Sequence, residues 1–140
     1  MNRLHFTIPR TLVLEILHHI QTQPDKEVCG LVGGDEKRAR SYYPVDNIDR
    51  FMANRFTMDE TGQIAAMKTM RSKNEELAAI FHSHPNGTAE PSVLDEVLGD
   101  YPEVITLIGA TGTRGVLELR GYRQTESGGI NEVELLMGEE

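Results

Sequence analysis

The chain has 140 residues, enough for one domain with a buried core, and we expect residues 1–140 to form a single domain. Its net charge of −8 argues against binding to nucleic acids or anionic membranes, because such binding depends on basic surfaces. The one cysteine excludes an internal disulfide and any zinc site built from several cysteines.

The hydrophobic segments of the chain are all short. None approaches the ~20 consecutive apolar residues that a helix needs to cross a bilayer. Polar and charged residues interrupt the segment from Leu4 to Leu17, so the N-terminus lacks the pattern of a secretory signal. We therefore expect a cytoplasmic protein.

The N-terminal third of the chain predicts a strand, a helix and a second strand. The first strand is expected at Leu4–Ile8. Pro9 suits a first helical turn, and apolar residues then recur at helical spacing as far as Gln21. After a turn at Gln23–Lys26, an acidic residue opens the apolar strand Glu27–Gly33.

The next segment predicts a hairpin followed by a loop. Gly33–Glu36 is typical of a tight turn, and Ala39–Val45 is expected to return as a strand. Residues Asp46–Arg55 are polar with scattered apolar positions and predict a loop. Phe56–Met58 is expected to form a short strand.

A second helix and a buried strand are expected next. Asp59 is a suitable N-cap for a helix that runs to about Asn74, with Ile64, Met67 and Met70 on one face. The methionines are interpreted as core residues. The apolar run Leu77–Phe81 then predicts a buried strand.

The remaining elements complete an α/β pattern. A third helix is expected from Ser92 to about Gly99, and a loop at Gly109–Gly115. Three strands are predicted in this part of the chain, at Val104–Ile108, Val116–Arg123 and Ile130–Met137. Strands interleaved with about three helices indicate an α/β fold around a mixed sheet.

Chemistry-bearing residues gather where the strand Leu77–Phe81 ends. His82 and His84 are two apart, so their side chains leave an extended chain on the same face. Asp95 lies three residues past Ser92, in the first turn of the following helix. Two histidines and one carboxylate would leave a fourth position open, as in a catalytic zinc site.

Simpler interpretations exist for each of these residues. Ser92 and Asp95 also fit a helix N-cap followed by an acid, and Glu27 alone would be a solvated charge at a strand start. Cys29 is expected to be a small core residue and not a nucleophile. His18 and His19 are expected to be surface or boundary residues of the helix. It is the conjunction of two histidines, a turn and an acid that favours a metal site.

The segment resembles the JAMM (MPN+) zinc metalloprotease motif. That motif has an upstream Glu, then His-Ser/Thr-His-Pro, and a Ser that follows the second His after seven residues, the Pro included, with Asp after two more residues. The matching residues here are Glu27, His82, Ser83, His84, Pro85, Ser92 and Asp95. The wider resemblance runs from about Thr7 to Ala110 and leaves the last thirty residues without family features.

The resemblance implies a function and a role for each motif residue. His82, His84 and Asp95 would bind Zn²⁺, Glu27 would act as general base, and Ser92 would donate a hydrogen bond to the oxyanion. Ser83 should point away from the histidines and is not expected to be a nucleophile. The implied activity is hydrolysis of a peptide or isopeptide bond after the Gly-Gly tail of a ubiquitin-like or sulfur-carrier protein. The implied fold is a curved sheet with helices, related to that of cytidine deaminases.

Other functions stay open at this point. A non-catalytic MPN scaffold would need the ligand set to be present but misaligned. A zinc deaminase needs His-x-Glu and a Cys-x-x-Cys pair, and this chain has His84 at the Glu position and one cysteine. Iron or cobalt would also suit a His-His-Asp site, and a homodimer is left open.

Overall fold

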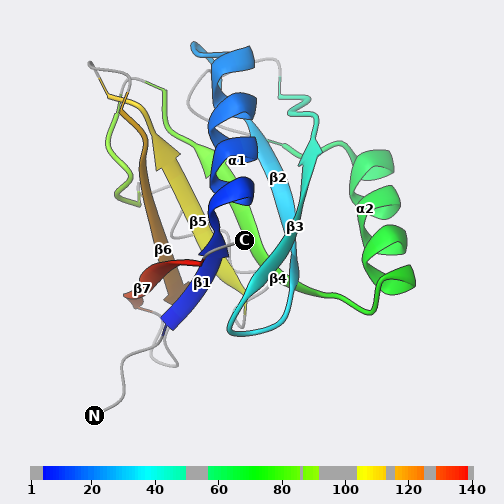
Figure 1. Ribbon diagram of the computed structural model, residues 1–140. Helices are drawn as coiled ribbons and strands as arrows, with labels where there is room; N and C mark the ends of the chain where they lie inside the picture. The colour runs from blue at the N-terminus through cyan, green and yellow to red at the C-terminus, as the bar shows by residue number, and fades with distance from the viewer. Residues whose placement is uncertain are drawn as a thin grey trace.

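The computed structural model describes residues 5–49, 57–85, 87–91, 104–112, 116–124 and 129–138. Two helices and seven strands lie in these ranges (Figure 1). Their bounds are β1 His5–Pro9, α1 Arg10–Thr22, β2 Cys29–Gly34, β3 Ala39–Val45, α2 Glu60–Ser72, β4 Glu76–Ser83, β5 Ile105–Ala110, β6 Glu118–Gln124 and β7 Ile130–Gly138. The predicted α/β fold is confirmed. The third helix, expected after Ser92, falls outside the described residues.

The seven strands form one mixed sheet in the order β1-β7-β6-β5-β4-β2-β3. β1 pairs with β7 and β4 pairs with β5 in parallel, while the other neighbours are antiparallel. The first edge strand also reaches the hairpin before β3, because the backbone N–H of Thr7 donates to the Lys37 carbonyl at 2.9 Å. The sheet is therefore strongly curled, as the JAMM resemblance implies.

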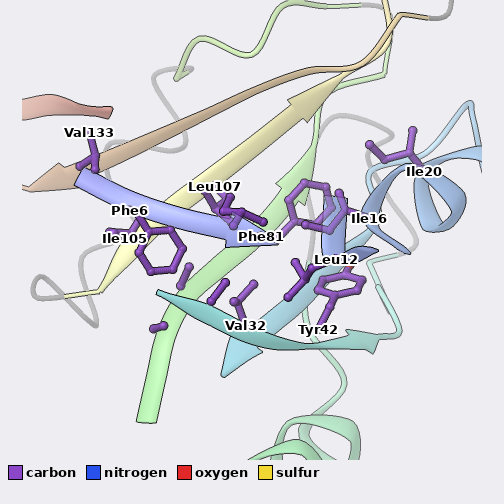
Figure 2. Packing of buried hydrophobic residues seen from close by; sticks show 14 of the residues in the cluster. Phe6, Leu12, Ile16, Ile20, Val32, Tyr42, Phe81, Ile105, Leu107 and Val133 are labelled. Carbon is purple, nitrogen blue, oxygen red and sulfur yellow. The ribbon is translucent and has the colours of Figure 1, made fainter. Parts of the chain in front are cut away.

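Helix α1 covers one face of the sheet (Figure 1). Its buried residues Leu12, Ile16 and Ile20 recur at four-residue spacing, which places them on one side of a helix. Figure 2 shows them packed among apolar side chains of the sheet. These include Phe6, Val32, Tyr42, Phe81, Ile105, Leu107 and Val133. This cluster is the main core and holds the central strands in place.

Helix α2 packs against the opposite face. Its residues Ala66 and Met70 contact Leu31 and Val45, whereas the neighbouring strand residue Val32 points toward α1. The side chain of Asp59 caps the helix by accepting from the Gly62 N–H at 3.3 Å, as predicted. The methionine interpretation is likewise confirmed for Met70.

Ile64, predicted to share a face of this helix with Met67 and Met70, is 56% exposed and does not join Met70 in the core. Ala66 and Met70 are four residues apart and share the side that meets the sheet. Ile64 precedes Ala66 by two residues, which is about 200° around a helix and so on the far side.

Three predicted boundaries shift in the structure. β2 begins at Cys29, so Glu27 lies just before the strand and not in it. Gly34 belongs to β2, and the turn follows it at Asp35–Arg38. Gly109, expected in a loop, continues β5 beside Ser83. A Cβ at Gly109 would lie 3.0 Å from the Phe81 ring, so this glycine serves close packing and is not a chain break.

The outer parts of the fold agree with the remaining expectations. The strands Ala39–Val45 and Ile130–Gly138 match their predicted segments closely. Of the short strand expected at Phe56–Met58, the described part shows a single bridge between Met58 and Asn47. Within the described ranges, no helix is long and apolar enough to cross a membrane.

Candidate active site

His82 and His84 lie at the end of β4, in the centre of the sheet. His82 is completely buried between β2 and β5. The Nε2 atoms of the two imidazoles are 3.2 Å apart. Two nitrogen ligands about 2.0–2.1 Å from one tetrahedral zinc are themselves about 3.3 Å apart. This distance is that of a hydrogen bond between the two rings, and it would also suit two ligands of one shared metal ion.

The ring of His84 is oriented by the chain that follows it. Its Nδ1 atom lies 2.8 Å from the backbone carbonyl oxygen of Thr88. A carbonyl only accepts hydrogen bonds, so Nδ1 carries the proton and Nε2 keeps its lone pair in the neutral ring. Fixing the tautomer in this way is how proteins prepare a histidine for metal binding.

Glu27 reaches the same site from a distant part of the sequence. In the antiparallel pairing of β2 with β4, Cys29 stands opposite His82. The pairing continues by one step, since the Ser83 N–H donates to the Val28 carbonyl at 2.9 Å, and this brings Glu27 level with His84. Side-chain alternation then places Glu27 on the histidine face of the sheet. Glu27 is only 4% exposed, so its carboxylate is largely shielded from water.

Asn47 fixes the backbone at Glu27. Its side-chain Nδ2 donates to the Glu27 carbonyl oxygen at 2.9 Å. Its Oδ1 accepts from the N–H groups of Asp49 and Thr57, at 3.0 and 2.9 Å. The Asn47 side chain thus links the backbone of Glu27, the expected base, to both ends of the segment 47–57. Nothing in the local sequence distinguishes Asn47 from other loop asparagines, so the sequence did not predict this role.

Two of the five sequence-predicted site residues, Ser92 and Asp95, lie outside the described residues. Among the residues that are described, no group of three or more His, Cys, Asp or Glu side chains is placed to hold a metal ion. The structure thus brings together Glu27, His82 and His84. Asp95 remains the ligand predicted from the sequence.

Residues 9–121 match the family described as prokaryotic homologs of the JAB domain. The chain belongs to this family. The JAMM resemblance, which covers about Thr7 to Ala110, is confirmed by a match of nearly the same extent.

Two curated relatives carry functional names. The chain is 28% identical over 110 residues to a "Probable TtuB-protein conjugate cleaving protease" of Thermus thermophilus, covering 79% of this chain and 74% of that protein. It is 25% identical over 87 residues to a "Desampylase" of Haloferax volcanii, covering 61% of this chain and 63% of that protein. The match therefore spans less than two thirds of the Haloferax relative.

Two solved structures share the fold. Protein DSY2949 of Desulfitobacterium hafniense superposes with a TM-score of 0.85 at 30% identity, over 96% of this chain and 94% of that one. A protein of Salinibacter ruber gives a TM-score of 0.69 at 19% identity, over 96% and 92% of the two chains. The second supports the fold alone.

Ser83 has a structural role in this JAB domain. Its side chain is buried, and its Oγ accepts a hydrogen bond from the Val28 N–H at 2.8 Å. In an antiparallel ladder this N–H would bond a backbone carbonyl, so the hydroxyl replaces it where the two strands separate. The bond joins the strand ends that carry Glu27 and the two histidines.

Replacing Ser83 with Ala should lower the stability of the JAB domain. The Val28 N–H would lose its partner in a buried position, which costs about 1–3 kcal/mol in the free energy of unfolding. Urea unfolding would measure the change. Ser83→Thr retains the hydroxyl and should stay much closer to wild type. Equal stability of the Ala variant and wild type would show that the bond contributes nothing.

Cys29 lies on the same sheet face as His82, but its thiol is expected to be unreactive. It is fully buried opposite His82, and its Sγ lies 3.4 Å from the Val45 carbonyl oxygen. Burial first, then the negative charges of Glu27 and Asp46, raise the pKa of the Cys29 thiol to about 12. A thiol that stays protonated is a poor nucleophile. The expectation that Cys29 is a core residue is confirmed.

The native domain should therefore resist thiol reagents in mildly alkaline buffer. Cys29 is the only cysteine, so any reaction reports on it alone. The unfolded chain has an ordinary thiol pKa and should react much faster. Because the folded pKa is the higher one, this group's contribution to stability is complete below the unfolded pKa and declines as pH rises above it. Fast labelling of the folded protein would contradict the raised pKa.

Proposed function

We propose that this chain is a zinc-dependent peptidase or isopeptidase of the JAB family. The observation that carries the proposal is the 3.2 Å separation of the two Nε2 atoms, His82 to His84, on the sheet face shared with Glu27. The donor set fits zinc, because imidazole nitrogens and a carboxylate are common zinc ligands. Asp95 is proposed as the third ligand.

Zinc held there would polarise the scissile carbonyl and lower the pKa of an attacking water from ~15.7 toward ~7. The chain's own residues would supply the proton transfers. The Glu27 carboxylate would accept a proton from the water and return it to the leaving amine. Ser92 is proposed to donate a hydrogen bond to the developing oxyanion.

Both relatives' names support a conjugate-cleaving activity, and one of them names a TtuB–protein conjugate. We propose that the substrate here is also a ubiquitin-like or sulfur-carrier protein, cleaved after its Gly-Gly tail. The bond would be either an isopeptide bond to a lysine or a peptide bond to a following residue. Either bond would present the same tail to Glu27 and the two histidines.

The proposal can be tested with two substrates that share one carrier. In one, a Gly-Gly-terminated ubiquitin-like protein is fused to a reporter, and in the other it is linked to a lysine side chain. The zinc-loaded chain should release the carrier with a free Gly-Gly end, identified by mass spectrometry, and a chelator should stop the release. Zinc-bound protein that binds the carrier without cleaving either substrate would favour the non-catalytic scaffold.

A further inference from the structure

Ala89, five residues after His84, is held by side chains from a distant strand. It belongs to no helix or strand, yet its side chain is completely buried. Its N–H donates to Glu118 Oε1 at 3.1 Å, and its carbonyl accepts from the Tyr122 hydroxyl at 2.9 Å. Both backbone polar groups of one loop residue are therefore bonded by β6.

The sheet register explains how β6 reaches this loop. Ser83 pairs with Gly109, and the His84 N–H donates to the Gly109 carbonyl at 2.8 Å, so His84 and Ala110 are neighbours. Ala110 pairs in turn with Glu118. Ala89, in the chain that follows His84, packs against these paired strand residues on the sheet face. Small side chains at Ala89 and Ala110, packed in one cluster, let this part of the chain lie close to the strands.

Glu118 and His84 form hydrogen bonds with opposite sides of a single peptide group. The carbonyl that accepts from His84 Nδ1 belongs to Thr88, and the N–H of that same peptide is the Ala89 N–H that donates to Glu118. Hydrogen bonds on both sides of a peptide polarise it and strengthen each other. A carboxylate on the N–H side makes the Thr88 oxygen a better acceptor for the imidazole proton.

We propose that Glu118 and Tyr122 are positioning residues for His84. Glu118 acts through the Thr88–Ala89 peptide, and Tyr122 holds Ala89 in place through the carbonyl of the next peptide. In many metal sites a carboxylate bonds the ligating histidine directly and sets its tautomer and basicity. Here the peptide is interposed between the two. Arg120, 3.0 Å from Glu118 Oε2, holds the carboxylate in place. Tyr122 bonds the Ala89 carbonyl of the next peptide and so fixes Ala89 from its other side. This inference rests on the proposed metal-binding role of His84.

The first test is zinc affinity, measured by competition with a chromophoric chelator. Glu118→Leu and Tyr122→Phe should each weaken zinc binding by about 10-fold, the loss typical of an outer partner of a ligand. Glu118→Gln keeps an acceptor oxygen and should lose less. The matched control is Glu134→Gln, which removes a carboxylate of β7 that pairs with His5 and should bind zinc like wild type. Wild-type affinity in both the Leu and Phe variants would overturn the proposal.

The second test needs no metal. Nitrogen-15 NMR of the His84 ring, at a pH where the imidazole is neutral, should find the proton on Nδ1 in the wild type. Glu118→Leu and Tyr122→Phe should both shift population toward the other tautomer, while Glu134→Gln should not. An unchanged tautomer in variants that thermal unfolding shows to be folded would overturn the proposal. If the wild type bound no zinc, the proposed function would fail, and the NMR result would still decide whether β6 orients His84.

Discussion

Glu27→Gln is expected to abolish most hydrolysis while leaving zinc bound. A positioned general base contributes about 10²–10⁴-fold to rate, so kcat should fall by that factor. The amide has nearly the shape of the carboxylate and cannot accept the proton from water. The backbone at this position is held independently by Asn47, so the side chain should stay in place. Turnover of a Gly-Gly fusion and zinc content per chain would be measured together.

Glu76→Gln is the matched control for this experiment. Glu76 is an exposed carboxylate at the opposite end of β4, paired with Gly34 and remote from the histidines. It should retain full activity and full zinc content. If Glu27→Gln were as active as Glu76→Gln, another group would have to be the base. Loss of zinc from Glu27→Gln would instead assign Glu27 to metal binding.

His82→Ala is expected to lose the metal and with it all activity. A ligating imidazole is removed, so the drop in zinc affinity should exceed the roughly 10–100-fold that loss of an outer partner costs. Elemental analysis after dialysis against a weak chelator should find about one zinc per wild-type chain and almost none in the variant. Substrate turnover should fall to the background rate.

Because His82 is completely buried, the substitution also leaves a cavity, and unfolding has to be measured beside metal content. His18→Ala is the matched control. His18 is an exposed residue of α1, which covers the other face of the sheet, so this variant should keep its zinc. A folded His82→Ala protein that still bound one zinc would contradict the proposed ligand set. Absence of zinc from the wild type as well would favour the scaffold.

Local patterns in the sequence were sufficient for the fold class and for the histidine pair. Apolar residues at helical spacing predicted α1 almost to the residue, because the pattern reflects which side of the helix is buried. The two-residue spacing of His82 and His84 predicted their shared face, since side chains alternate along any strand. Such features need no knowledge of which strands are neighbours.

Local patterns failed where packing between elements decides the outcome. Ile64 fits an apolar helical stripe but is exposed, because the sheet contacts the side of α2 that carries Ala66 and Met70. Gly109 resembles a loop residue but continues β5. A glycine stands there because the Phe81 ring leaves little room for a side chain. Secondary-structure propensity does not indicate which side of a helix will pack against a sheet. It also does not indicate where a neighbouring aromatic ring leaves no room for a side chain.

The tertiary structure alone decided what surrounds the histidines. Glu27 is 55 residues before His82 in the sequence, and only the pairing of β2 with β4 brings it level with His84. Glu118 and Tyr122 lie outside the JAMM motif, and β6 reaches Ala89 because it follows β5 in the sheet. The sequence by itself determined the chemical groups and their local spacing. Their assembly into one site depends on long-range strand pairing, which no local pattern encodes.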